Sequence, residues 1–285
     1  GNVVMHDRIA GWREAGVLAG ICAACVAPLA LGSVFGESAG FTAFAIVFCL
    51  FLASTVYRMR DVWPSGGTIK QEEPLVSGLC RLFQDTGVRR LLLIGLLNAL
   101  PGGLTATLFL FFVEDKLQAG SHAGPMLLLF FASAGLAAPL WSKAAARFGP
   151  KPAMLCGMIA SIFAFLWALT LGAGDWKAFY VISAASGAAL GADMTLLPAM
   201  LSRRLAATGL DSVQAFGVWG FINKASLAVA AVIVLPLIGY AGFAPGPGNS
   251  EEALGALAIA YAGAPCALKA IAAGLLLMTP ISKEA

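Results

Sequence analysis

The chain has 285 residues, of which 59% are hydrophobic and 12% charged, with a mean hydropathy of +0.85 and a formal net charge of +3. Soluble domains are about 45–50% apolar and about 25% charged, so the composition excludes most soluble classes. It indicates a protein that crosses a membrane several times.

Long apolar stretches predict the membrane-spanning segments, because about 18 or more such residues are needed to cross a bilayer. Eight candidates lie at residues 15–35, 39–57, 91–113, 124–142, 153–173, 178–201, 215–240 and 254–279. A span must pair its backbone groups internally, and runs without strict alternation fit helices and not barrel strands. We therefore predict an all-α polytopic membrane bundle with about eight transmembrane helices.

The longest connection separates two spans from six. Residues 58–90 carry Pro64 and Pro74 and then an apolar spacing that suits an amphipathic helix on the membrane surface. Six spans are the size of one half of a transporter built from two halves. We predict that 1–57 holds the last two helices of an N-terminal half, 58–90 a central cytoplasmic linker, and 91–285 a six-helix C-terminal half. A complete eight-span protein is the alternative to a piece of a protein with about twelve spans.

Basic residues predict the orientation. Fourteen of the 18 fall in alternate connections: Arg8, Arg13, Arg58, Arg60, Lys70, Arg81, Arg89, Arg90, Lys143, Arg147, Lys151, Arg203, Arg204 and Lys283. Lys116 and Lys177 lie on the other side, while Lys224 and Lys269 lie within spans. This asymmetry places both ends of the chain in the cytoplasm, with the plasma (inner) membrane as the expected location. It also explains the net charge without nucleic acid as a partner.

Three charged side chains fall inside spans, where an ionisable group is a functional-site hypothesis by default. Asp193, Lys224 and Lys269 lie about 12, 14 and 15 Å from the cytoplasmic ends of their helices, at 1.5 Å per residue. This level is near the bilayer midplane, where two-half transporters hold solutes and coupling ions.

Asp193 has two interpretations. It could form a structural ion pair with Lys224 or Lys269, or it could bind solute. Two lysines and one aspartate leave an excess positive charge, which is costly to bury. We therefore expect an acidic residue from upstream spans to face Lys224. Small residues above and below Lys224 predict that its face packs against other helices or a cavity; they are Gly217, Gly220, Ala228 and Ala231.

Helix-breaking and close-packing residues mark two other spans. Asn98, Pro101, Gly102 and Gly103 are expected to interrupt the 91–113 helix, with Asn98 as a candidate solute-binding residue and a passive kink as the alternative. Gly187-x-x-x-Gly191 predicts close helix packing.

Nothing in the sequence predicts an enzyme or a metal site. The spans contain no histidine, and His6 and His122 fall in predicted loops. Five of the six cysteines lie within spans, so we expect no disulfide. No nucleophile–base pair is visible. We expect no cofactor apart from a coupling ion.

Several segments resemble a known family. They are Arg8-Ile-Ala-Gly-Trp-Arg-Glu-Ala, Trp141-Ser-Lys-Ala-Ala-Ala-Arg-Phe-Gly-Pro-Lys, Gln214-Ala-Phe-Gly-Val-Trp-Gly-Phe-Ile-Asn-Lys and Ile238-Gly-Tyr. Together they look like the glycoside–pentoside–hexuronide:cation symporters, the melibiose-permease branch of the major facilitator superfamily. The resemblance begins just before that family's fifth helix, which implies helices 5–12 of a twelve-helix fold.

The resemblance implies cation-coupled symport, driven by sodium or protons, of a sugar, glycoside or related small solute by a monomer in the bilayer. Arg13 matches an arginine near the sugar, although a snorkelling interfacial role is the alternative. Lys224 matches a lysine near the cation site, and we group Asn223 and Lys269 with it. Lys143, Arg147, Gly149 and Lys151 match a loop that braces the cytoplasmic side during gating.

The chain departs from the family after the tenth helix, where Ser202-Arg203-Arg204 replaces the usual acidic pair. Arg13 and two buried lysines would also suit negative charge. The alternatives are therefore a lipid or organic-anion transporter of the same fold, or a non-transporting membrane sensor.

Overall fold

The structure is a computed structural model that describes residues 16–17, 20–24, 26–28, 30–60 and 75–279. Every regular element in these residues is helical, and seven helices are long and apolar enough to span a membrane. The predicted all-α polytopic bundle is confirmed. The main helices are α2 (Glu37–Met59), α3 (Leu75–Gln84), α4 (Thr86–Phe111), α5 (Ala123–Phe148), α6 (Pro150–Ala168), α7 (Trp176–Thr208), α8 (Ser212–Tyr240), α9 (Glu251–Ala258) and α10 (Ala264–Met278).

Most helices extend beyond the apolar runs that predicted them, because polar end residues continue the helical backbone. Two π-helical segments complete the spans: Phe112–Lys116 prolongs α4, and Ile259–Gly263 joins α9 to α10. The predicted first span, 15–35, lies partly outside the described residues. Its described part forms a shorter apolar helix between Gly20 and Phe35.

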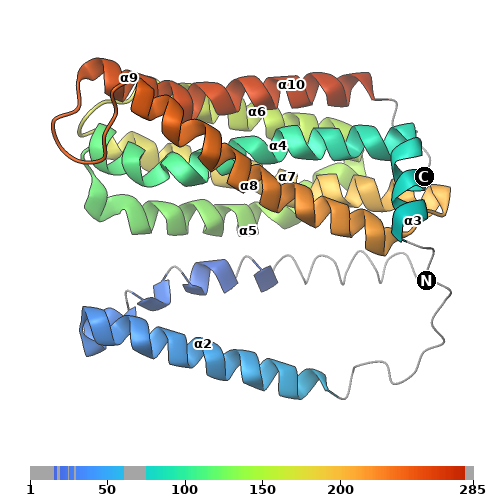
Figure 1. Ribbon diagram of the computed structural model, residues 1–285, viewed down its shortest axis with the longest axis horizontal. Helices are drawn as coiled ribbons and strands as arrows, with labels where there is room; N and C mark the ends of the chain where they lie inside the picture. Colours follow the sequence, from blue (N-terminus) through green and yellow to red (C-terminus); the bar gives the residue numbers. More distant parts are fainter. Residues whose placement is uncertain (1–15, 18–19, 25, 29, 61–74, 280–285) are drawn as a thin grey trace.

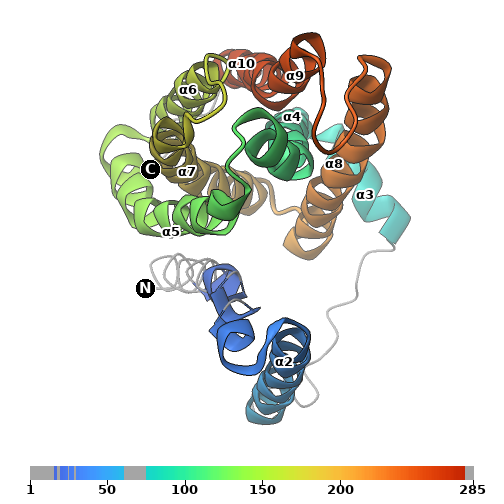
Figure 2. The ribbon, with the colours of Figure 1, turned by 90° about the vertical axis from the view of Figure 1, so that its left-hand side faces the viewer.

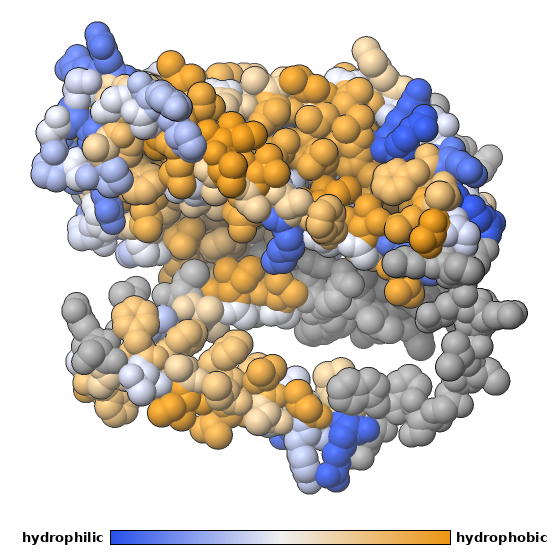
Figure 3. Space-filling model, viewed as in Figure 1, coloured by the Kyte–Doolittle hydropathy of each residue, from blue (hydrophilic) through white to orange (hydrophobic). Residues whose placement is uncertain are grey.

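The six spans after the linker form one bundle. Figure 1 shows α4 to α10 running side by side, and the end-on view in Figure 2 shows α2 apart from them. α7 is the most enclosed of the spans, because half of its apolar stretch is buried inside the bundle. It packs against α5 and α6. In Figure 3 hydrophobic residues cover most of the middle of the bundle, apart from a small hydrophilic patch at its lower edge, and hydrophilic residues gather at both ends. This distribution fits a bilayer around the middle of the bundle.

Small residues set the closest contacts. A Cβ added at Gly187 or Gly191 would collide with the backbone carbonyl oxygen of Phe130 or Ala134, so the glycine pair lets α7 approach α5 closely. Close packing at this motif was predicted. Gly103 similarly faces the backbone oxygen of Ser226 on α8.

α4 runs without a break through its proline and glycines, so the expected interruption is wrong. Pro101 lies inside the helix, and the hydroxyl of Thr105 donates to the carbonyl oxygens of Pro101 (3.0 Å) and Gly102 (3.1 Å). The single hydroxyl hydrogen of Thr105 is thus shared between two carbonyl oxygens of the preceding turn. Gly103 serves the contact with α8 and does not break the helix.

The face of α8 that carries Lys224 does not pack against the other described helices, but Lys224 itself lines a cavity, which is one of the two predicted environments. Gly217, Gly220 and Lys224 are exposed, and a Cβ at either glycine would meet open space. α8 instead packs on α4 through a four-residue repeat of buried residues, Ser226, Ala230, Val234 and Ile238. None of the described helices covers Gly217 or Gly220 on this face, and the side chain of Lys224 is accessible there.

A short helix, α3, packs at one end of the bundle. α3 lies where an amphipathic helix was predicted, and Figure 1 shows it crossing the ends of the spans. Its Leu82 is buried, and α3 packs against α4 and α8. A location on the membrane surface and the division of the chain into two halves stay predictions.

Asp85 joins α3 to α4 and to α7. Its Oδ1 accepts from the backbone N–H of Val88 (2.8 Å) and caps α4, while Arg204 donates to both carboxylate oxygens, at 3.1 and 2.7 Å. The Arg204 hydrogen bond lowers the pKa of the Asp85 carboxyl; partial burial opposes this, and the Val88 N–H lowers it further. The basic residue that departs from the family pattern therefore anchors the start of α4.

Candidate functional site

A cavity of about 510 Å³ lies within the six-helix bundle. It is large enough for a small organic molecule. Residues from α4, α5, α6, α7, α8 and α10 line it, and they include Asn98, Asp193, Asn223, Lys224 and Lys269. Five residues that the sequence predicted as site residues therefore line one cavity, and they belong to four different helices.

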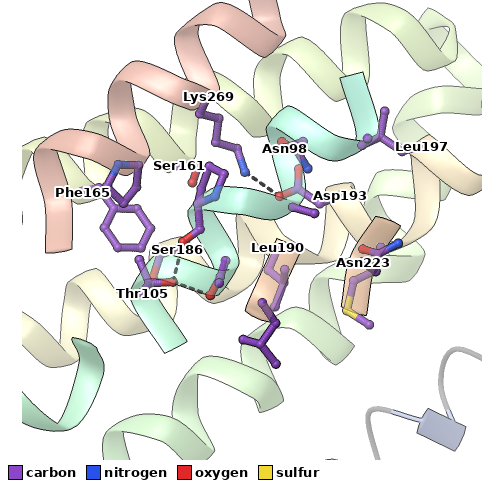
Figure 4. A pocket seen from close by; sticks show the side chains of 18 of the residues that line it. Asn98, Thr105, Ser161, Phe165, Ser186, Leu190, Asp193, Leu197, Asn223 and Lys269 are labelled. Atoms are coloured by element: carbon purple, nitrogen blue, oxygen red, sulfur yellow. Dashed lines mark hydrogen bonds and ion pairs between the residues drawn. The ribbon is translucent and has the colours of Figure 1, made fainter. Parts of the chain in front are cut away.

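An ion pair joins α7 to α10 at the wall of the cavity. Lys269 Nζ donates to Asp193 Oδ2 at 2.5 Å, and the two side chains are 7% and 11% exposed. Figure 4 shows Lys269 reaching down from its helix to the carboxylate. Because burying either charge alone is costly, each group compensates the other. Asp193 therefore pairs with Lys269, and the alternative pair with Lys224 does not form.

Two oxygen atoms at this wall have no hydrogen-bond partner among the residues that the structure describes. They are Asp193 Oδ1 and Asn98 Oδ1, and each is buried. Asn98 is 7% exposed and points toward the same part of the cavity as Asp193 in Figure 4. An unpaired buried acceptor costs about 1–3 kcal/mol, so the wall favours a group that donates hydrogen bonds.

Lys224 has a different environment. It is exposed at the cavity, and it has no ion pair with any residue that the structure describes. The neighbouring Asn223 donates from Nδ2 to the backbone oxygen of Trp219 on its own helix (2.9 Å). The α8 side of the cavity therefore carries an uncompensated positive charge.

Sequence reasoning missed several polar and aromatic residues of the wall. Ser161 and Ser186 are buried cavity residues, and Thr105 lines it as well. The aromatic part consists of Phe130, Phe131, Phe165, Phe216 and Trp219. Ser186 could have been found, because it lies seven residues before Asp193 and hence on the same helical face.

The sequence matches the family described as MFS/sugar transport protein over residues 3–283. The chain belongs to this family. It is therefore a multi-pass membrane protein of the major facilitator type, and a transporter of small solutes by family. No curated protein matches the chain significantly.

In this transporter the predicted gating loop lies apart from the cavity, at the turn between α5 and α6. Gly149 has φ +94°, a backbone conformation that favours glycine. Lys151 Nζ donates to the carbonyl oxygens of Leu277 (2.9 Å) and Thr279 (2.8 Å), so it satisfies the end of α10. Arg147 lies over the ring of Phe148, and Lys143 is exposed. The loop thus ties three helices of the bundle together.

The last predicted residue, Arg13, lies outside the described residues. Within the part of the chain that the structure describes, no three His, Cys, Asp or Glu side chains are grouped to hold a metal ion. The transporter's cavity is therefore built from an ion pair, amide and hydroxyl groups, aromatic rings and one unpaired lysine.

Proposed function

We propose that this protein is a secondary active transporter that couples the entry of sodium or protons to symport of a sugar, glycoside or related solute. The supporting observation is one mid-bundle cavity that carries both an unpaired lysine and buried hydrogen-bonding groups. A cavity near the membrane midplane that contains an ionisable group is what a coupled transporter needs. Alternating access would expose this cavity to each side of the plasma membrane in turn.

Cation coupling is assigned to Lys224 with Asn223. Lys224 is exposed at the cavity without an ion pair in the described residues, whereas Lys269 is already neutralised within the bundle. A carboxylate from the N-terminal half would complete the charge balance at Lys224. A carboxylate shared between a lysine and a small cation can exchange one for the other, which links the cation to the conformational cycle.

The solute is assigned to the opposite wall, with Asn98 and Asp193 as binding residues and Arg13 as a further contact from the fifth helix. Lys269 contributes to the coupling chemistry indirectly, by holding Asp193 in an ion pair. The Asp193–Lys269 pair joins two helices of one bundle, so a rigid-body movement of that bundle leaves it intact. Lys143, Arg147, Gly149 and Lys151 would brace that movement at the cytoplasmic side.

Solute uptake into vesicles by the full-length protein tests the assignment. Under an imposed sodium or proton gradient, Lys224→Ala should abolish gradient-driven accumulation while leaving slow downhill flux. Lys177→Ala is the matched control, because that lysine is exposed at the start of α7 and does not line the cavity. If Lys224→Ala retains coupled uptake equal to the control, the role assigned to Lys224 is wrong.

A second candidate rests on the same lysine. An exposed, unpaired ammonium at the cavity would also attract an organic anion or an anionic lipid headgroup. In that case uptake of an anionic solute would persist without a cation gradient and would fall on Lys224→Ala. A sensor that does not transport would show no uptake in either experiment.

A further inference from the structure

α3 has a wider apolar face than the bundle covers. At about 100° per residue, six of its small or apolar residues follow one another around one side of the helix: Gly78, Leu82, Leu79, Phe83, Val76 and Cys80. Gly78 and Leu82, at one side of this arc, are buried against the bundle. Val76 and Phe83, toward the other side, are 73% and 47% exposed. About half of the apolar face therefore has no cover among the residues that the structure describes.

The uncovered half of α3 lies at the edge of the bundle. The backbone of Gly78 lies against the side chain of Gln214 at the start of α8, which fixes α3 beside that helix. In Figure 2 α3 extends outward past α8. α8 itself has exposed apolar side chains along its length, among them Phe221 and Val232, as a helix in contact with lipid has. The exposed apolar residues of α3 therefore lie where the side of a span meets the end of the bundle.

Basic side chains adjoin these apolar residues. Arg89, near the start of α4, places its Nη1 3.5 Å from the backbone oxygen of Phe83. The next residue, Arg90, is exposed and has no ion pair with any described residue. An exposed apolar residue of α3 thus has one guanidinium beside it and a second at the following position of α4.

The whole end of the bundle at which α3 lies is basic. The helices from α3 to α10 place eight basic residues there: Arg81, Arg89, Arg90, Lys143, Arg147, Lys151, Arg203 and Arg204. The acidic residues at this end, in the part of the chain that the structure describes, are Asp85 and Asp211. Arg204 binds the first, and the second caps α8. Such an excess of positive charge attracts anions, which acidic phospholipid headgroups supply at a membrane surface.

We propose that α3 and the start of α4 form a docking surface for the acidic phospholipids of the bilayer. Val76, Cys80 and Phe83 enter the boundary between headgroups and acyl chains, and Arg89 and Arg90 bind lipid phosphates. Amphipathic helices bind membranes by this combination of apolar burial and attraction to anionic lipid. The proposal names the lipid class and the contact residues for the surface helix that the sequence predicts. It is independent of the solute and of the coupling ion.

Cys80 lies at the centre of the exposed face and provides the position for a probe. In the full-length protein every other cysteine is replaced by serine, and Cys80 is labelled with bimane. The labelled protein is placed in nanodiscs of phosphatidylcholine with a rising share of phosphatidylglycerol. As the acidic lipid increases, the emission should shift to the blue and quenching by brominated lipid should increase. Raising the salt from about 0.1 M to about 1 M should reverse both changes, because the Debye length falls from about 10 Å to about 3 Å.

Variants separate the basic from the apolar contribution. Arg89→Gln combined with Arg90→Gln should raise the share of acidic lipid needed for half of the effect at least about threefold, since one arginine near the surface changes lipid affinity about fivefold. Lys143→Gln combined with Arg147→Gln is the matched control. It removes the same charge from the same end of the bundle, on α5, which lies across the bundle from α3 in Figure 2, and it should leave that share unchanged. Phe83→Ser should reduce quenching by brominated lipid at every share of acidic lipid.

Four results would overturn the docking surface. Bimane that aqueous iodide quenches and brominated lipid does not, in every bilayer, would mean that this face is in water. Bimane that neither quencher reaches would mean that protein covers the face, either another part of the full-length chain or a second protein. Lipid quenching that does not depend on acidic lipid would remove the headgroup from the account. Equal effects of the α4 and α5 variants would remove the specific role of Arg89 and Arg90.

Discussion

Removing one member of the Asp193–Lys269 pair should destabilise the protein more than removing both. The ammonium and carboxylate are 2.5 Å apart with side chains 7% and 11% exposed, so either group alone is a buried uncompensated charge. Breaking a buried pair costs about 3–5 kcal/mol, whereas replacing both partners with neutral groups of similar volume is often close to neutral. Because this pair borders a cavity that can admit water, we expect the lower end, about 3 kcal/mol, for each single variant.

The assay is a double-mutant cycle with Asp193→Asn, Lys269→Met and the combined variant. Unfolding of the purified protein is followed by tryptophan fluorescence as the mole fraction of a denaturing detergent rises in mixed micelles. The combined variant should be more stable than either single variant, with a coupling energy of about 2 kcal/mol or more. Additive losses, with the combined variant the least stable, would refute a compensated ion pair at this position.

Further predictions concern the ends and contacts of the bundle. Asp85→Ala should lower stability by about 1–2 kcal/mol through loss of the cap and the Arg204 pair, whereas Asp85→Asn keeps the cap and should cost at most about 1 kcal/mol. Because Arg204 lowers the pKa of Asp85, the stabilisation from this charge is present above about pH 4 and is lost as the pH falls through the lowered pKa; Asp85→Asn should remove that acid dependence in thermal melts. Gly187→Val should separate α7 from α5 and reduce the yield of folded protein, while Gly220→Val, at a glycine facing open space, serves as its control. Lys151→Ala should speed amide hydrogen exchange at the end of α10, and Lys143→Ala should not.

Features that depend on local sequence were predicted well. Span positions follow from apolar runs, because a bilayer demands a minimum length of apolar helix. The amphipathic spacing of α3 and the Gly187–Gly191 contact are likewise local properties that the structure contains. The common depth of Asp193, Lys224 and Lys269 predicted that they would approach one another, and all three line one cavity.

The ion-pair partner of Asp193 was not predictable from the sequence, because it depends on how the helices are rotated and arranged around one another. Depth alone could not tell whether Asp193 faces α8 or α10, and only the packed bundle selects Lys269. Similarly, Pro101 and its glycines looked like a helix break, since the sequence does not reveal the Thr105 hydroxyl bonds or the α8 contact that accompany the continuous helix. The small-residue face of α8 was predicted to pack against other helices or a cavity; none of the described helices covers Gly217 or Gly220, whereas Lys224 on the same helix lines the cavity.

Arg204 shows how a departure from a family pattern can be explained locally. Sequence comparison marked it as a loss of the usual acidic pair. In the structure the Arg204 guanidinium donates hydrogen bonds to the carboxylate of Asp85. Asp85 follows α3 and caps the start of α4. Arg204 therefore has a structural role at the end of the bundle.

The most direct test of the account is the response of solute accumulation to a cation gradient. Vesicles containing the full-length protein are loaded with a neutral hexopyranoside inside and outside at equal concentration, and a sodium or proton gradient is then imposed. Coupled symport predicts that the solute accumulates above its equilibrium level and that collapsing the gradient with an ionophore reverses the accumulation. Solute concentrations that stay equal on both sides under either gradient would contradict cation coupling.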